Sequence, residues 1–352
     1  MSDWMIYGAN GYTGELVARE AAGRGLKPIL AGRNAEAVGT LASELGLPHR
    51  AFSLDAPRLE GVSAVLHCAG PFVRTSRLMV EACLAAKAHY LDITGEIAVF
   101  EKVLSRSREA EEKGIALLPG VGFDVVPSDC LAARLAAELP DATELTLAFA
   151  STRGSISRGT MKTMIESLPH AGAVRRDGRI LPVPPAFHAR EIDFPGGRRW
   201  AMTIPWGDVA TAWWSTGIPN IRVYTGTPPK AIRRMRRIAP FLPLLAWKPV
   251  KRFLQKQVEK RITGPSEEIR RTARIELWGE VRNAAGRSVT GTLVTPEGYQ
   301  FTAVSAVEAA ERAAQGGVPP GAWTPSRAFG ADFVTGLPGV EAFQISARPL
   351  SS

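Results

Sequence analysis

Apolar runs and stretches with helical spacing alternate through the first 120 residues of the chain. The short apolar runs predict strands at 3–7, 27–31, 49–53, 63–67, 89–93 and 115–118. The stretches between them predict helices at 13–23, 34–45, 75–87 and 96–113. Strands that alternate with helices imply right-handed crossovers and a parallel sheet covered on both faces. The pattern therefore predicts an α/β fold with a Rossmann-type, doubly wound parallel sheet.

The pattern changes at about residue 142, where longer runs of alternating apolar and polar residues begin. These runs lie at 144–151, 186–194, 198–204, 220–225, 271–281 and 288–295, and turn sequences separate them. We predict a second α+β domain with a largely antiparallel sheet over 126–323. A helix near 127–139 leads into it from the first domain at 1–125. The tail from about 324 to 352 is a candidate to return to the first domain.

Three glycines stand between the first predicted strand and the first predicted helix. Gly8, Gly11 and Gly14 have the spacing GxxGxxG. In this context the first glycine allows a tight turn, the second lets backbone approach a pyrophosphate, and the third lets helix and strand pack closely. The pyrophosphate would lie on unpaired amides at the helix N-terminus. We predict a dinucleotide site here, which the turn residues Asn10, Tyr12 and Thr13 complete.

The second predicted strand ends in Gly32-Arg33-Asn34, where the ribose of such a cofactor lies. An acidic residue at this place would bind a free 2′-hydroxyl, whereas Arg33 would pair with a 2′-phosphate. We predict that Arg33 and Asn34 contact NADP(H) rather than NAD(H). The alternative is that Arg33 is a solvated loop charge.

Three further loops follow predicted strands, at 68–72, 90–96 and 119–129, and are rich in small residues. Ligands of doubly wound sheets bind beyond the carboxyl ends of the strands. Small residues there let backbone approach a flat nicotinamide ring. We predict that Cys68, Ala69, Gly70 and Pro71 contact the cofactor.

The candidates for catalysis are Asp92 and Asp124 in these loops and Lys162, which opens a predicted helix of the second domain. Helix capping and loop bracing compete with proton transfer as roles for the two carboxylates. Arg158 or Lys162 could bind a carboxylate, a thioester carbonyl or a phosphate, or could be a solvated charge. A Tyr-x-x-x-Lys pair is absent from the sequence, which excludes the short-chain dehydrogenase mechanism.

The motifs GANGYTG, AGRN, CAGPF, YLDITGE and GVGFDVVPSD together resemble the saccharopine dehydrogenase-like oxidoreductases, a group similar to the trans-acting enoyl reductases of lipid and polyketide assembly. The resemblance covers about 1–130, and a looser likeness at 321–325 extends it toward the C-terminus. It implies an NADP-type nucleotide fold and a second domain of mixed sheet that covers the nicotinamide. It does not fix the substrate, because the family spans many chemistries.

The composition indicates a cellular compartment and argues against metal chemistry. At 352 residues two domains are expected. No N-terminal leader pattern and no long uncharged apolar run are visible. Three cysteines without CxxC spacing fit a reducing compartment, so we expect a cytoplasmic protein. The five histidines show no ligand spacing, so no metal site is expected.

The net charge of +9 is concentrated in one segment. Residues 230–261 hold eleven basic residues and one acid, Glu259, so the rest of the chain sums to −1. The stretch 228–262 reads as a basic amphipathic segment suited to an anionic membrane surface or an acidic carrier protein. A packed helix pair with solvated charges is the alternative. Nucleic acid is not expected as a partner, because no aromatic–basic interleaving is present. A homodimer stays open.

The sequence favours an NADPH-dependent reductase that transfers hydride to a double bond of an apolar, acyl-type substrate. One alternative is an oxidoreductase for a C–N bond of an amino-acid-like substrate. A second is a module that binds NADP(H) as a sensor without turnover, since the sequence shows no convincing proton donor.

Overall fold

The computed structural model describes residues 3–152, 172–242 and 265–348. The chain divides into two compact units, each made of two stretches of sequence. Unit 1 comprises Met1–Val126 and Gly298–Pro338, and unit 2 comprises Pro127–Glu297 and Gly339–Ser352. Arg158, Lys162 and residues 243–262 of the basic segment lie outside the described residues.

Unit 1 is built on a parallel sheet. Its strands are β1 (Asp3–Tyr7), β2 (Ile29–Gly32), β3 (His49–Ala51), β4 (Val62–His67), β5 (His89–Asp92), β6 (Ala116–Leu118) and β15 (Gly321–Ala322). Their order is β15-β6-β5-β4-β1-β2-β3, and all neighbours are parallel. Because β2 and β4 flank β1 on opposite sides, the winding reverses at β1. The predicted doubly wound Rossmann-type sheet is confirmed.

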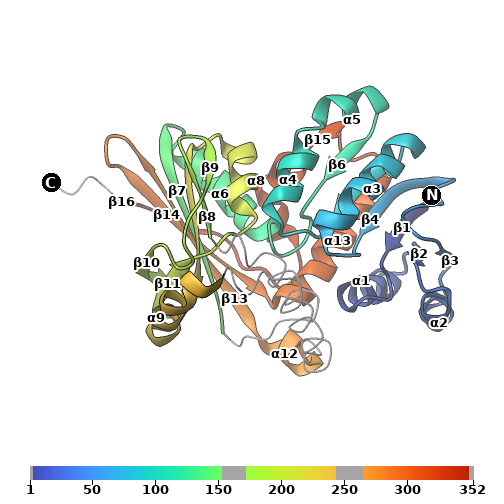
Figure 1. The fold of residues 1–352 in the computed structure, drawn as a ribbon, viewed down its shortest axis with the longest axis horizontal. Helices are drawn as coiled ribbons and strands as arrows, with labels where there is room; N and C mark the ends of the chain where they lie inside the picture. The colour runs from blue at the N-terminus through green and yellow to red at the C-terminus, as the bar shows by residue number, and fades with distance from the viewer. Residues whose placement is uncertain (1–2, 153–171, 243–264, 349–352) are drawn as a thin grey trace. The chain divides into compact units, whose positions relative to one another are not determined.

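Helices cover both faces of this sheet (Figure 1). The helices α1 (Tyr12–Gly23), α2 (Ala35–Leu45) and α13 (Gly298–Ala314) pack on one face, and α3 (Phe72–Ala86), α4 (Ile97–Leu104) and α5 (Ser107–Lys113) pack on the other. The short segments α14 (Pro325–Phe329) and η3 (Ala331–Gly336) follow α13. The helix predicted at 96–113 is two helices, because the Ser105 hydroxyl donates to the Lys102 carbonyl and competes with the helical pattern.

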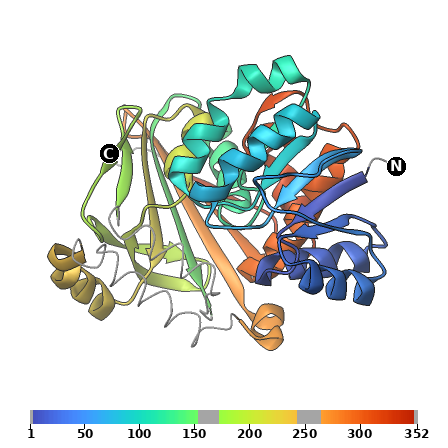
Figure 2. The same cartoon turned by 45° about the vertical axis from the view of Figure 1, so that its right-hand side comes forward.

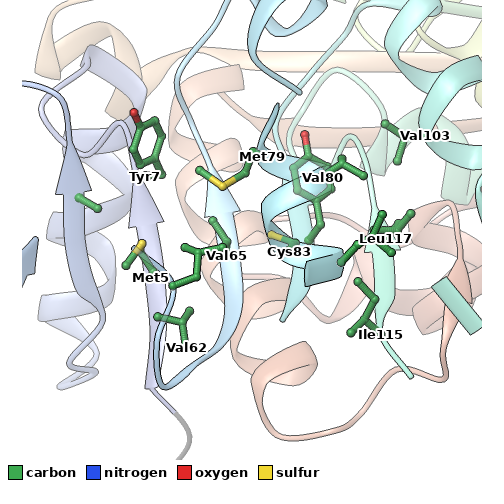
Figure 3. Close-up of a cluster of buried hydrophobic side chains, with 14 of the residues drawn as sticks. Met5, Tyr7, Val62, Val65, Met79, Val80, Cys83, Val103, Ile115 and Leu117 are labelled. Carbon is green, nitrogen blue, oxygen red and sulfur yellow. The ribbon is translucent and has the colours of Figure 1, made fainter. Parts of the chain in front are cut away.

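Figure 3 shows how the core of unit 1 forms between the sheet and α3. Met79, Val80 and Cys83 of α3 face Val65 of β4 and Met5 of β1, and all five side chains are buried. Their spacing along α3 follows the i, i+1, i+4 rule for one buried helix face. This core fixes the strand ends from which the functional loops leave.

Unit 2 is built on a mostly antiparallel sheet. Its strands are β7 (Ala142–Ser151), β8 (Ala173–Arg176), β9 (Arg179–Pro182), β10 (Ala189–Phe194), β11 (Gly197–Thr203), β12 (Asn220–Gly226), β13 (Arg274–Asn283), β14 (Ser288–Pro296) and β16 (Gln344–Arg348). The main order is β10-β11-β12-β7-β13-β14-β16, with a β8–β9 hairpin attached to β12. Only β12 and β7 pair in parallel along this order. The long strands β7 and β13 lie side by side in Figure 2.

Helix α6 (Val126–Glu138) packs on one face of the unit 2 sheet. An added Cβ at Gly279 would lie 2.6 Å from Leu135, and one at Gly291 would lie 3.1 Å from Leu131. These two glycines therefore let α6 lie close to the strands. The other helices of unit 2 are α8 (Asp208–Thr216), α9 (Pro229–Ile238) with the short η2 (Ala239–Phe241), and α12 (Glu267–Thr272). Within the described ranges, no helix is long and apolar enough to span a bilayer.

The unit 2 sheet is curled, and its edge strand β10 lies against β13 on the face of the sheet opposite to α6. Ile192, Phe194 and Trp278 are buried together inside this curl. Two ion pairs cross it, from Arg190 to Glu280 at 3.5 Å and from Arg199 to Glu276. The predicted run at 271–281 begins as a strand only at Arg274, because Ser266 caps the short helix α12 before it.

The return of the chain to unit 1 differs from the predicted tail at 324–352. It starts earlier, at Gly298, because the buried helix α13 packs against α1 and the sheet. It also ends earlier, at Pro338, because β16 pairs with β14 of unit 2. The first crossing, at Val126, lies next to the predicted boundary at 125.

Candidate active site

The glycine turn after β1 has the geometry that its sequence predicts. Gly8 has a φ of +87°, and its amide donates to the Ala31 carbonyl at 2.7 Å. The Gly11 amide donates to the Gly8 carbonyl at 3.0 Å. A Cβ at Gly14 would lie 2.1 Å from that same carbonyl oxygen, so only glycine lets α1 approach β1 this closely.

The loop at 68–71 lies directly beside this turn. The Cys68 amide donates to the Tyr7 carbonyl at 2.7 Å, and a Cβ at Gly8 would meet Ala69 at 2.9 Å. These contacts bring the predicted residues Cys68 and Ala69 to the glycine turn, at the strand pair where the winding reverses. Gly70 and Pro71 continue this loop into α3. Open doubly wound sheets bind their ligands at this switch point.

Two helices begin at this edge of the sheet, and they differ in whether a side chain caps their N-terminus. The Glu96 carboxylate accepts from the Phe72 and Val73 amides, both at 2.8 Å, and so caps α3. Helix α1 has Gly11 at its N-cap and no side chain that caps it. The first turn of α1, with Tyr12 and Thr13, thus fits a pyrophosphate, whereas the N-terminus of α3 is already occupied by a carboxylate.

Asn10 and Arg33 lie at or beside the end of β2, where the ribose is predicted to bind. The Asn10 Oδ1 atom lies 2.9 Å from where a Cβ of Gly32 would be, so Asn10 lies against the end of β2. Arg33 is exposed, and no carboxylate of the described residues forms an ion pair with it. The Asn34 side chain accepts from the Ala37 amide at 3.1 Å and caps α2. Asn34 therefore already has a structural role at this position.

Replacement of Arg33 by alanine should weaken NADPH binding much more than NADH binding. A charge-assisted bond to a phosphate is worth about 1.5–3 kcal/mol, so NADPH affinity should fall roughly ten- to a hundredfold. Titration of both nucleotides into the wild type and the variant measures this difference. Lys27→Ala, which removes a charge before β2, is the control and should change neither affinity. Equal losses for the two nucleotides would contradict the 2′-phosphate assignment.

Asp92, at the end of β5, braces the neighbouring loops. Its carboxylate accepts from the Tyr90 hydroxyl at 2.6 Å, the Thr94 amide at 3.0 Å and the Gly120 amide at 2.8 Å. Burial raises the pKa of Asp92 to about 6, against the lowering effect of these three hydrogen bonds. The side chain is fully buried, and its acceptor sites are used within the protein.

Asp124 has a different environment. It lies in the loop after β6, it is partly exposed, and no hydrogen bond or ion pair engages its carboxyl group among the described residues. A Cβ at Gly95 would lie 2.4 Å from Asp124 Oδ2, so the carboxyl group rests against the loop after β5. Burial, with a smaller effect of the Glu96 charge, raises the pKa of Asp124 to about 7.

Helix α13 holds the loop that carries Asp124. The Thr302 hydroxyl accepts from the Phe123 amide at 3.0 Å, and the Ser305 hydroxyl donates to the Val121 carbonyl at 2.8 Å. Sequence reasoning missed both residues, because they lie some 180 positions from their partners. Their hydroxyls on a mostly apolar helix were the one available signal.

A buried histidine braces the loop at 68–71. The Thr75 hydroxyl donates to the Ala69 carbonyl at 2.8 Å, so His67 Nε2, 3.0 Å away, must donate to Thr75. Burial lowers the pKa of His67 to about 3, which keeps the ring neutral. Burial, with a smaller effect of Asp92, raises the pKa of the Cys68 thiol, which argues against a thiolate nucleophile at this position.

Comparison with known proteins finds relatives of the part of the chain that carries this geometry. Residues 4–118 match the family described as the saccharopine dehydrogenase NADP binding domain. A putative trans-acting enoyl reductase of Mycobacterium tuberculosis is 32% identical over 187 residues, which are 48% of this chain and 45% of that protein. A human saccharopine dehydrogenase-like oxidoreductase is 28% identical over 151 residues, 36% of this chain and 35% of that protein. The matches span about half or less of these relatives.

The fold has a close counterpart among solved structures. The apo saccharopine dehydrogenase (L-Glu forming) from Saccharomyces cerevisiae superposes with a TM-score of 0.67, covering 99% of this chain and 100% of that one at 11% identity. At this identity the likeness concerns the fold alone. The match at residues 4–118 supports the NADP-type cofactor expected from the sequence. Residues 4–118 of the chain therefore match the NADP binding domain of the saccharopine dehydrogenase family, and the chain as a whole is similar in fold to a saccharopine dehydrogenase.

Proposed function

We propose that the chain is an NADPH-dependent reductase of a carbon–carbon double bond in an apolar, acyl-type substrate, and that Asp124 donates the proton. Reduction of such a bond adds a hydride to one carbon and a proton to the other. The glycine turn and Arg33 would hold NADPH, and the bound cofactor would supply the hydride. The protein itself must supply the proton.

The environment of Asp124 carries this proposal. A general acid needs a pKa near the working pH and a carboxyl group free to reach the substrate. Asp124 has both properties, since its pKa is about 7 and its carboxyl group forms no hydrogen bond with the described residues. Asp92 has a similar position in the sequence but is held by three donors, so we assign it to bracing.

The surrounding residues position this acid. The Asp92 carboxylate, at the end of β5, accepts from the Gly120 amide in the loop after β6. The Ser305 hydroxyl of α13 donates to the Val121 carbonyl in that same loop after β6. Glu96 fixes the start of α3 next to the 68–71 loop and keeps a negative charge near Asp124. That charge helps to hold the proton on Asp124 at neutral pH.

The choice of a double bond rests on the names of relatives, which include a putative trans-acting enoyl reductase of Mycobacterium tuberculosis at 32% identity and a trans-acting enoyl reductase of Mycobacterium bovis at 30% identity. The matched region covers at most about half of each relative, so the substrate itself stays a proposal.

The substrate class can be tested with the purified chain and C4-deuterated NADPH. Unsaturated acyl thioesters should oxidise the cofactor and gain one deuterium on a former double-bond carbon. Turnover confined to imines of amino acids and keto acids would overturn the proposal in favour of C–N chemistry. Tight NADPH binding without turnover on either panel would favour a sensor module.

A further inference from the structure

A cluster of basic side chains surrounds one tyrosine–histidine pair in unit 2. The Tyr224 hydroxyl and His188 Nδ1 are 3.0 Å apart, with their rings nearly perpendicular. The strands fix this pair, because the Thr203 hydroxyl accepts from the His188 amide at 3.0 Å and Thr203 pairs with Tyr224. Tyr224 is buried, whereas His188 is exposed.

Three arginines converge on this pair from three different elements. Arg222 precedes Tyr224 by two residues on the same face of β12, and Arg190 follows His188 by two residues on β10. Arg236 comes from α9, where its Nε atom donates to the Ala186 carbonyl at 3.0 Å. We call His188, Arg190, Arg222, Tyr224 and Arg236 the His188 cluster.

The positive charge of the His188 cluster is only partly balanced. Glu280 lies 3.5 Å from Arg190, but it also lies 3.5 Å from Arg282. Arg222 and Arg236 form no ion pair with a carboxylate of the described residues. The three arginines, after the effect of burial, lower the pKa of His188, as expected for a ring that faces uncompensated cations.

We infer that the His188 cluster is a binding site for a phosphate group, as a phosphate ester or a lipid headgroup. Guanidinium groups offer planar pairs of donors that match phosphate oxygens. The tyrosine–histidine pair adds a neutral donor in either tautomer: His188 Nε2–H if Tyr224 donates to Nδ1, or the Tyr224 hydroxyl if Nδ1 donates to it. This inference does not depend on the proposed redox reaction.

The described part of the basic segment, 228–242, bears on whether the phosphate belongs to a lipid or to a soluble ester. Helix α9 carries Lys230, Arg233, Arg234 and Arg237 besides Arg236, and only Ile232 of this helix is buried. Ile238 is 40% exposed and Phe241 is 63% exposed at its C-terminal end. Exposed apolar side chains beside cations suit a lipid headgroup, whereas the cluster alone suits a soluble phosphate ester.

The test is pyrophosphate binding to the whole chain in saturating NADP, which keeps the glycine turn occupied. Calorimetry should show saturable binding to the wild type, at least tenfold weaker binding to Arg222→Gln, and unchanged binding to Arg179→Gln, a charge-matched control on β9. Heat without saturation, or equal affinity of the wild type and Arg222→Gln, would overturn the site.

Vesicles distinguish the two sources. If a lipid headgroup is the ligand, the wild type should sediment with phosphatidylglycerol vesicles but not with phosphatidylcholine vesicles, and pyrophosphate should release it. If a soluble ester is the ligand, pyrophosphate binds and neither vesicle does. Both results support the phosphate site. Vesicle binding that Arg222→Gln and pyrophosphate leave unchanged would assign the attraction to general surface charge and contradict the site.

Discussion

Asparagine in place of Asp124 should lower the turnover number about 10²- to 10⁴-fold while NADPH affinity stays unchanged, because general acid catalysis contributes rates of this order. The asparagine side chain keeps the shape of the carboxyl group but has no proton to transfer. The wild-type rate should also fall as the pH rises above about 7, where Asp124 loses its proton. This decline should be absent from the residual activity of the variant.

The pH dependence of the melting temperature gives an independent measure of the pKa of Asp124. The folded-state pKa of Asp124, about 7, lies above its ordinary value of 3.8, so the folded protein binds the proton more tightly than the unfolded chain. The resulting stability is fully present below about pH 4 and is lost as the pH rises through 7. The wild type should therefore lose melting temperature between about pH 4 and pH 7 relative to Asp124→Asn, and the difference should change little above pH 7.

Asp92→Asn is the matched control at the neighbouring strand end. It should reduce stability, since three buried hydrogen bonds are disturbed, but the pH decline of the rate above 7 should persist. If Asp92→Asn abolishes that decline and Asp124→Asn does not, the roles of the two carboxylates are reversed.

The sequence located both carboxylates but could not distinguish them. Asp92 and Asp124 each follow an apolar strand and stand among small residues. Their difference arises from partners brought by the fold, since the Gly120 amide donates to Asp92 whereas, within 3–152, 172–242 and 265–348, no donor hydrogen-bonds to Asp124. Hydrogen-bond partners of this kind depend on three-dimensional placement, which hydrophobic periodicity does not encode.

Most of the unit 1 sheet was predictable, because most of its strands are short runs rich in apolar residues and bounded by turn residues, but the two-residue strand β15 was not predicted. The return of α13 was not, because its alanine-rich sequence is buried around much of its circumference and shows no clear polar face. Lys162 lies outside the described residues, so its catalytic role stays a prediction.

The second large effect concerns Gly11. Alanine at this position should abolish NADPH binding at low concentrations, with an affinity loss of at least roughly a hundredfold, while the protein stays folded. Gly11 has a φ of −83°, which alanine adopts freely, and its Cβ would meet only the Gly8 carbonyl oxygen at 3.2 Å. The cofactor-free protein should therefore tolerate alanine at position 11. The cost in stability at this N-cap should be about 1 kcal/mol.

Variants of Gly11 and Gly14, with Gly23 of α1 as the control, separate packing from cofactor binding. Gly14→Ala places a Cβ 2.1 Å from the Gly8 carbonyl oxygen, so it should lower the melting temperature strongly as well as NADPH binding. Gly23→Ala, at the far end of α1 with no atom within 4 Å of the new Cβ, should change neither. Calorimetric titration and thermal unfolding of the variants measure both quantities. If Gly11→Ala binds NADPH as the wild type does, the pyrophosphate does not lie on the first turn of α1, and the glycine spacing serves only the packing of that helix against β1.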